Sequence, residues 1–280
     1  MQTHLVCYAD EQMTISQELC ARSAKEVGGI DHVHKFGPST IDRAFYNRYK
    51  DTLEAPQRGG GKGFWLWKPY IVEAAIRAIP DGDVLIYCDS GVEWVRDVFY
   101  LIHQGAFTQS DVLLFGNEHR HIDWCKAEVI SKMFGCSTNW EYNGQAYARF
   151  KQVQASVIIM RACDYTREFA STWLAWSCIP GFINDDFNPD LQQPEFREHR
   201  NDQSILTNLA IEDNIPLHWW PTQYGHSIKS NYPIDVYPQM FYHHRYRNND
   251  WYAYMKHHDI PQTHSADRAI NHFMKQPKNV

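Results

Sequence analysis

The chain has 280 residues, a net charge of −6 and 44% hydrophobic residues, a composition typical of a soluble globular protein with a sizeable core. The acidic balance argues against a protein that coats nucleic acid, because neutralising phosphates requires a surplus of Lys and Arg. No apolar run is long enough to span a bilayer, and the N-terminus MQTHLVCYADEQ lacks the basic flank of a signal peptide. We therefore expect neither a nucleic-acid partner nor a membrane span.

The first part of the chain alternates strands with helices. Apolar runs predict the strands, and apolar side chains at helical spacing predict the helices. In chain order, we expect a strand over Thr3–Ala9, a helix over Thr14–Val27, a strand over Asp31–Phe36, helices over Ile41–Leu53 and Phe64–Ile79, and a strand over Val84–Cys88. Such an alternation predicts the α/β class with a mostly parallel central sheet.

The pattern loosens after this point. The remaining predicted elements are strands over Val112–Gly116 and Ala155–Met160, helices over Trp124–Phe134, Tyr165–Ser177 and Asp202–Ile211, and a polar loop over Asp185–His199. From Pro216 onward the chain is rich in His, Tyr, Trp and Pro, and we expect short strands at best. The predicted organisation is one domain over residues 1–280, with a nucleotide-binding half over 1–116 and a more irregular half over 117–280.

The seven cysteines are scattered, and no two form a Cys-x-x-Cys pair. Their spacing therefore suggests neither a zinc knuckle nor a redox motif. Several lie in apolar runs, where a free thiol behaves as a small buried hydrophobe. We expect a reducing compartment, and so a soluble protein of the cytoplasm.

A carboxylate ends one of the predicted buried strands. The segment Val84–Gly91 reads VLIYCDSG, which places Asp89 at the strand's carboxyl end. In open α/β sheets, ligands bind beyond these ends, and Asp10 follows the first strand in the same way. Asp before Ser-Gly is also good turn and capping chemistry. Taken alone, the motif favours the capping interpretation.

A glycine-rich segment adds a second signal. Residues 58–63 read RGGGKG and precede a predicted helix. Glycine permits close backbone approach to an anion, and a helix N-terminus favours phosphate, while Arg58, Lys62 and Lys68 add positive charge. The spacing matches neither a Walker A loop nor a Rossmann fingerprint. Together with Asp89, the segment indicates a diphosphate site completed by Mn²⁺ or Mg²⁺.

The stretch RGGGKGFWLWKPYIVEAAIRAIPDGDVLIYCDSG resembles glycosyltransferases of the GT-A fold. Their pattern is a Gly-rich loop, Trp-x-Trp-Lys-Pro, a helix, and a strand ending in Tyr-x-Asp-x-Gly or Tyr-x-Asp-x-Asp. The segments WCKAEVISKMF, QASVIIM and HRNDQSILTNL follow in family order, so the resemblance covers roughly residues 3–245. The length and general character of the sequence resemble the capsid-glycan glycosyltransferases of large algal (chlorella) viruses. A viral protein of this kind would act in the host cytoplasm.

The resemblance implies a fold and a set of partners. The fold would be GT-A-like and Rossmann-related, a mixed but mostly parallel sheet flanked by helices in a single domain. The donor would be a UDP-sugar, the acceptor a glycan or glycoprotein bound by the half over 117–280 with its C-terminal extension, and the cofactor a divalent metal, Mn²⁺ or Mg²⁺. Apart from the resemblance, His119, Arg120 and His121 follow the strand over Val112–Gly116, and we expect them to touch the acceptor.

Donor-binding and metal-binding residues are also implied by the resemblance. The donor would be bound by Tyr8, Ala9, Asp10, Arg58, Lys62, Lys68, Asp89, Ser90, Gly91, Gln154 and Gln203. Asp89 would also bind the metal, but Gly91 stands where the motif's second Asp would be, so one carboxylate is missing. His243 or His244 would complete the metal shell. Only one of these two can face inward in a strand, because neighbouring side chains alternate.

Transfer to a hydroxyl requires a general base if the configuration is inverted, as we expect. The candidates are Asp202 first, then Asp186 and its neighbour Asp185; Asp202 could also merely cap its helix. In a retaining enzyme, Gln203 or Asp202 would instead lie against the sugar's reacting face.

The predicted function is a metal-dependent transferase using UDP-xylose, ahead of UDP-glucose, UDP-galactose and UDP-rhamnose, in glycoprotein glycan synthesis. The alternatives are a catalytically weak sugar-nucleotide-binding protein, motivated by the missing second Asp, and a nucleotidyltransferase on a related fold. A nucleotidyltransferase would be expected to have a Gly-rich loop directly after its first strand, which YADEQ lacks.

Overall fold

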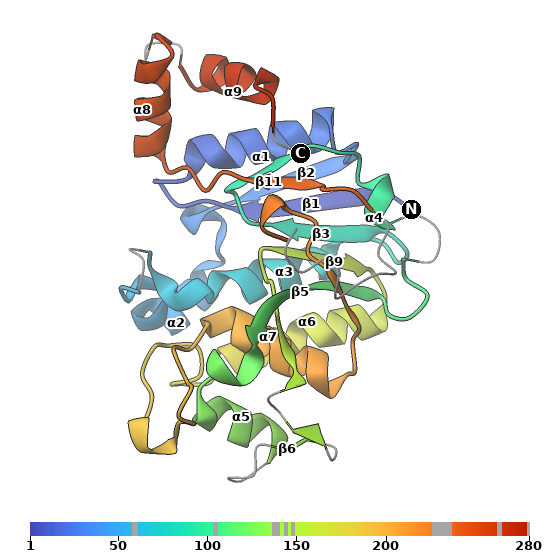
Figure 1. Cartoon of the computed structure of the whole chain (residues 1–280), viewed down its shortest axis with the longest axis vertical. Helices are drawn as coiled ribbons and strands as arrows, with labels where there is room; N and C mark the ends of the chain where they lie inside the picture. The colour runs from blue at the N-terminus through green and yellow to red at the C-terminus, as the bar shows by residue number, and fades with distance from the viewer. Residues whose placement is uncertain are drawn as a thin grey trace.

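The computed structural model describes residues 1–57, 61–102, 106–135, 141–142, 145–146, 149–225, 237–261 and 265–278. Within these ranges a central seven-stranded sheet carries helices on both faces (Figure 1). Its strand order is β10-β5-β9-β3-β1-β2, with β8 paired to β5. The strands are β1 (Thr3–Tyr8), β2 (His32–Phe36), β3 (Val84–Cys88), β5 (Val112–Arg120), β8 (Lys151–Val153), β9 (Val157–Arg161) and β10 (Leu217–Trp219).

Strand directions place this fold in the predicted α/β class. Strand β1 pairs in parallel with both β2 and β3, and β10 is parallel to β5. Strand β9 is antiparallel to both of its neighbours, β3 and β5, so β5 runs in the same direction as β3. Along the main path only β9 is reversed, and the predicted mixed, mostly parallel sheet is confirmed.

Two small two-stranded sheets and the helices complete the described chain. The small sheets pair β4 (Val92–Trp94) with β11 (Phe241–His243), and β6 (Glu141–Tyr142) with β7 (Gln145–Ala146). The helices are α1 (Thr14–Glu26), α2 (Arg43–Glu54), α3 (Trp67–Ala78), α4 (Phe99–Ile102), α5 (Ala127–Phe134), α6 (Asp164–Ser177), α7 (Asn201–Glu212), α8 (Asn248–His257) and α9 (Ser265–Lys275). None of the helices in the described ranges is both long enough and apolar enough to cross a membrane.

The apolar side chains of the sheet divide between two cores, as strand geometry requires. Val6 and Leu85 face the core that α3, α5, α6 and α7 cover. Their neighbours Leu5 and Ile86 face the opposite core, on the side of α1. Because both faces are covered, β3 is buried along its whole length, which explains why its sequence is continuously apolar rather than alternating.

The final third departs from the sequence prediction. We expected short strands at best, but α8 and α9 are helices that lie beside α1 in Figure 1. A third core joins them to α1 through Trp251, Met255, Ile270 and Phe273. The spacing of these residues is helical, and the abundance of His and Tyr between them obscured that period.

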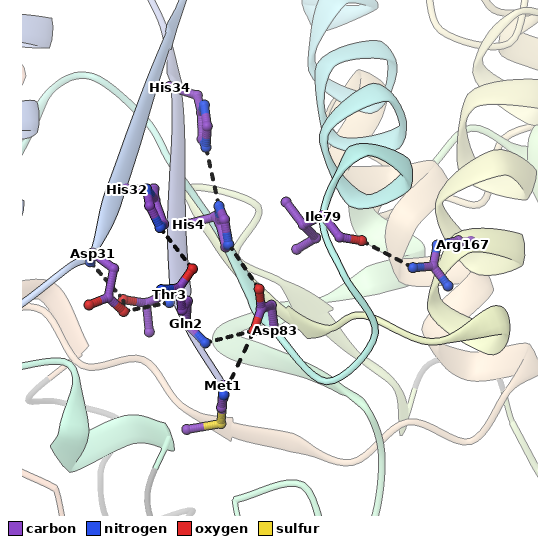
Figure 2. Close-up of polar contacts among 10 residues, drawn as sticks. All are labelled: Met1, Gln2, Thr3, His4, Asp31, His32, His34, Ile79, Asp83 and Arg167. Carbon is purple, nitrogen blue, oxygen red and sulfur yellow. Dashed lines mark hydrogen bonds and ion pairs between the residues drawn. The ribbon is translucent and has the colours of Figure 1, made fainter.

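A polar cluster ties the first three strands together at their amino ends (Figure 2). The Asp83 carboxylate accepts the backbone N–H of Gln2 at 2.7 Å and lies 3.3 Å from Nε2 of His4. Nδ1 of His4 is 3.3 Å from Nε2 of His34, and the ring of His32 stacks on that of His4 at 4.6 Å. This amino-end cluster fixes the register of β1 against β2 and β3.

Candidate functional site

A cavity of about 680 Å³ opens at the carboxyl ends of β1 and β3. This is the end at which open α/β sheets bind ligands. Residues from both ends of the chain line it, since β11 pairs with β4 and so carries the C-terminal segment to the tip of β3. Of the predicted site residues, Tyr8, Asp10, Lys62, Lys68, Asp89, Ser90, Gly91, Gln154, Asp185, Asp202, Gln203 and His243 lie on its wall.

The ammonium group of Lys68 joins two carboxylates on the cavity wall. Its Nζ lies 3.3 Å from Oδ1 of Asp89 and 3.2 Å from Oδ2 of Asp202, and it donates to the carbonyl oxygen of Ala155 at 3.2 Å. Lys68 and Asp202 are almost fully buried, whereas 38% of the Asp89 side chain is exposed. Burial lowers the pKa of Lys68, but Asp202 and Asp89 outweigh it and hold that pKa above its usual value.

Asp202 has the electrostatic setting of a proton acceptor. Burial raises its pKa to about 6, against the lowering effect of the Lys68 charge and with a further rise from Asp89. A base is most effective when its pKa lies near the working pH. Asp202 lies in the first turn of α7, and the indole Nε1 of Trp173 donates to its backbone oxygen at 3.0 Å. Its side chain points to Lys68, so pairing with that ammonium is a structural role beyond helix capping.

Aromatic rings form the wall next to the first strand. The rings of Tyr8 and Trp67 stack with centroids 3.9 Å apart. Burial, with a smaller contribution from Asp10, raises the pKa of the Tyr8 hydroxyl. The hydroxyl of Ser90 donates to the backbone oxygen of Tyr8 at 2.5 Å, which fastens the turn after β3 to the end of β1. A flat, partly exposed ring pair of this kind suits stacking with a base.

The backbone just before α3 is strained. Phe64 and Trp65 both have positive φ values, of 47° and 60°. This region is costly for bulky side chains and is often found at functional sites. Trp65 and Lys62 both line the cavity.

The two histidines of the HHRYR segment face opposite ways. His243 lines the cavity, and burial lowers its pKa to about 4, opposed by the charge of Asp89. His244 is surrounded instead by aromatic rings, among them Trp251 and Phe273, and burial lowers its pKa to about 3. The expected alternation thus selects His243 as the cavity-facing member of the pair.

The predicted glutamines are engaged with the protein. Gln203 donates to Oε1 of Gln152 at 2.8 Å and accepts from the backbone N–H of Ala155 at 3.4 Å. Gln154 donates to the hydroxyl of Ser156 at 3.0 Å. Both line the cavity, but the amide of Gln203 is held at both ends, which argues against its turning toward a sugar.

Several predicted residues lie away from the cavity. Ala9 is buried, and its backbone N–H donates to Phe36. Asp186 is exposed outside the cavity wall, where its carboxylate accepts from Asn184 at 2.6 Å. Arg58 falls outside the residues that the structure describes.

The predicted acceptor contacts are also away from the cavity wall. His119 packs against Trp124, Arg120 pairs with Asp123, and His121 is buried near Asn208. None of the three, all in the described part of the chain, is on the cavity wall.

The metal-binding capacity of the site is limited. Across the described ranges, no three His, Cys, Asp or Glu side chains converge as a metal site. Asp89 and His243 do share the cavity, and Nδ1 of His243 is buried with no hydrogen-bond partner among the described residues. A neutral imidazole is the form that binds metals. These two side chains fit a cation whose other ligands are phosphate oxygens and water.

Other residues on the wall were missed by the sequence analysis. Tyr87 donates to Oδ1 of Asp89 at 2.6 Å. Tyr87 precedes Asp89 by two residues at the end of β3, and this spacing could have identified it, because residues two apart in a strand share a face. Asn201 contacts Asp185, whereas Arg245 and Arg247 arrive with the C-terminal segment. No local pattern links those two arginines to the end of β3.

Comparison with known proteins supports the fold. No family model and no curated protein matches the chain. The apo structure of the bifunctional glycosyltransferase WbbM is similar with a TM-score of 0.50 and 11% identity, over 87% of this chain and 46% of that one. Mouse xyloside xylosyltransferase 1 gives a TM-score of 0.45 with 10% identity, covering 87% of this chain and 97% of its own.

A third solved structure is also similar. The glycosyltransferase involved in glycosylation of the major capsid of PBCV-1 has a TM-score of 0.44 and 10% identity, covering 99% of this chain and 100% of its own. At these identities the likeness concerns the fold, and the likeness to WbbM confirms the GT-A-like architecture predicted from the sequence.

Proposed function

We propose that this protein is a glycosyltransferase that moves a sugar from a nucleotide-sugar donor to a hydroxyl of a glycan acceptor. One observation carries the proposal. Two carboxylates, Asp89 and Asp202, lie on one cavity wall and are bridged by the buried ammonium of Lys68. The more exposed carboxylate suits donor and metal binding, and the buried one suits proton transfer.

The donor half of the proposal assigns the nucleotide to the end of β1. The stacked Tyr8 and Trp67 rings offer an aromatic face for the base, and Asp10 lies beside them on the wall. The diphosphate would lie over the turn Asp89–Gly91. Asp89 and His243 would hold a divalent cation there, which when bound stabilises negative charge on the leaving diphosphate.

The proposed reaction inverts the configuration of the sugar. The acceptor oxygen forms a bond to the anomeric carbon, the bond from that carbon to the phosphate oxygen breaks, and its electron pair leaves with UDP. The proton of the acceptor hydroxyl passes to the carboxylate of Asp202. At neutral pH that carboxylate is ionised but still basic, because its pKa is about 6.

The donor sugar is the finer part of the proposal, with UDP-xylose as the first candidate. A panel of UDP-sugars with Mn²⁺, followed by NMR, would detect slow donor hydrolysis and name the sugar directly. We expect one UDP-sugar to be hydrolysed and Asp89→Asn to lose that activity.

Asp213→Asn is the matched control, since Asp213 is exposed beyond the far end of α7 and pairs with Tyr165. Metal-dependent UDP binding without hydrolysis of any sugar would favour a catalytically weak binding protein. The absence of UDP binding would contradict the proposal altogether.

A further inference from the structure

We propose that Arg245 binds the diphosphate of the donor from the place where a second motif carboxylate would stand. This inference rests on the proposed function, because it assumes that a nucleoside diphosphate occupies the cavity. It concerns a residue that the sequence analysis did not select. Three observations carry it: the packing around Gly91, the position of Arg245 on the cavity wall, and the charges already neutralised there.

The packing at Gly91 leaves no space for a side chain. A Cβ atom built on Gly91 would lie 2.9 Å from Cα and 3.3 Å from N of Arg245. The backbone N–H of Arg245 also donates to the carbonyl oxygen of Gly91 at 3.1 Å. A carboxylate at position 91 is therefore incompatible with this arrangement. The close approach of the Arg245 backbone thus explains why the motif has Gly91 instead of a second Asp.

The chain holds Arg245 in this position by strand pairing. His243 of β11 is paired with Val92 of β4, one residue beyond Gly91. Two residues later the backbone of Arg245 adopts a left-handed conformation with φ 58°. Such a conformation is uncommon for residues other than glycine. It fixes the backbone beside Gly91 while the exposed side chain lines the cavity.

The distribution of charge distinguishes Arg245 from Lys68 and Arg200, two other cations on the wall. The Lys68 ammonium is already engaged with the protein, because it pairs with Asp89 and Asp202 and donates to the Ala155 carbonyl. Arg200 is paired with Glu198 at 2.8 Å. The Arg245 guanidinium lies 5.1 Å from the centroid of the Tyr224 ring, and no carboxylate in the described ranges pairs with it.

A guanidinium in this place suits a diphosphate. Its planar donor fork matches phosphate oxygens in pairs and keeps its charge at any working pH. With one carboxylate in the motif instead of two, less negative charge opposes the diphosphate at the turn. Arg245 therefore supplies positive charge on the side where the motif lacks its second acid.

Direct binding measurements on the full chain test this inference. The variants are Arg245→Asn, which removes the charge and suits a positive φ because Asn tolerates that conformation, and Arg245→Lys, which keeps the charge and loses the fork. Arg96→Asn is the control, because Arg96 is exposed, hydrogen-bonded to its neighbour Val95, and absent from the cavity wall. Calorimetric titration with UDP and with uridine, each in EDTA and in Mn²⁺, gives the dissociation constants.

We expect Arg245→Asn to raise the Kd for UDP by about 10- to 100-fold, the usual range for one charged hydrogen-bonding group. Uridine binding should be unchanged, Arg245→Lys should lose less than Arg245→Asn, and Arg96→Asn should bind UDP as the wild type does. The deficit should persist in EDTA, since the guanidinium acts on phosphate directly.

Other results would overturn the inference. If Arg245→Asn binds UDP like the wild type, Arg245 does not contact the diphosphate. If uridine binding weakens equally, the residue only shapes the backbone. If Arg245→Lys falls as far as Arg245→Asn, the positive charge of Arg245 does not contribute to diphosphate binding. If wild-type protein binds neither UDP nor uridine, the proposed function itself fails, which is a distinct outcome.

Discussion

The two ends of strands β1 and β3 carry polar clusters of opposite character. At the amino ends, Asp83 is hydrogen-bonded to Gln2 and His4, and these contacts lower the pKa of its carboxyl group (Figure 2). At the carboxyl ends, burial raises the pKa of Asp202 to about 6. The charged form of Asp83 is therefore stabilised, whereas the charged form of Asp202 is destabilised.

The comparison shows how one sheet separates stability from chemistry. The amino-end cluster satisfies its polar groups within the protein, which holds three strands in register. The carboxyl-end cluster leaves charge beside a cavity, and an acid in a cleft whose pKa is raised by burial is typical of functional sites. Substitutions at the two ends should therefore affect different measurements.

The largest expected effect separates the two ends most sharply. Asp202→Asn should lower the transfer rate by about 10²–10⁴-fold, since it removes the base, with UDP binding retained. Asp83→Asn should leave the transfer rate unchanged and lower the thermal unfolding midpoint. Rates from NMR and midpoints from circular dichroism check both. Loss of activity in Asp83→Asn at a temperature where the variant is folded would contradict a purely structural role for the amino-end cluster.

The second effect concerns the acid limb of the pH–rate profile. Activity should fall as the pH drops through about 6, because Asp202 then becomes protonated. The charge of Lys68 lowers the pKa of Asp202, and Lys68→Met removes that charge. The pKa of Asp202 should then rise, and the acid limb should move up by about 1–3 pH units, the usual effect of one adjacent charge. Lys68→Arg keeps the charge and should shift the limb less. An unmoved limb in Lys68→Met would show that a different group titrates.

A smaller effect concerns Trp173, which holds the backbone of Asp202 in place. Trp173→Phe removes the hydrogen bond to the backbone of Asp202 and should lower kcat about tenfold through misplacement of the base. The Kd for UDP should stay constant, because Trp173 is not on the cavity wall. Trp176→Phe, on the same helix but stacked on Phe182, is the matched control. Equal losses in both variants would indicate a general packing defect.

The smallest effect belongs to the amino-end cluster alone. Burial, followed by the charges of His4, His32 and Lys25, lowers the pKa of His34. Below a pH of about 6.5 the unfolded chain binds the proton more readily than the folded chain, so stability falls as the pH decreases. Melting curves should show this decline in the wild type. In His34→Gln the decline should be shallower. An identical slope would show that protonation of His34 does not cause the decline.

Most of the sheet and the helices of the first 211 residues followed from local patterns. The run VLIYC predicted β3, and helical spacing with a terminal Gly pair predicted α1. Small boundary differences remain, such as α3 beginning at Trp67 after a short turn of 3₁₀ helix rather than at Phe64. The roles assigned to the site residues remain predictions.

The sequence by itself determined that acidic residues end the strands β1 and β3, because strand length and turn chemistry are local properties. Only the tertiary structure decided that Lys68 bridges Asp89 and Asp202, that His243 rather than His244 faces the cavity, and that Arg245 closes over Gly91. Most of these contacts join segments more than a hundred residues apart, and those of His243 and Arg245 depend on the pairing of β11 with β4. Local periodicity carries no information about which distant segments meet, since that choice is made by packing of the whole chain.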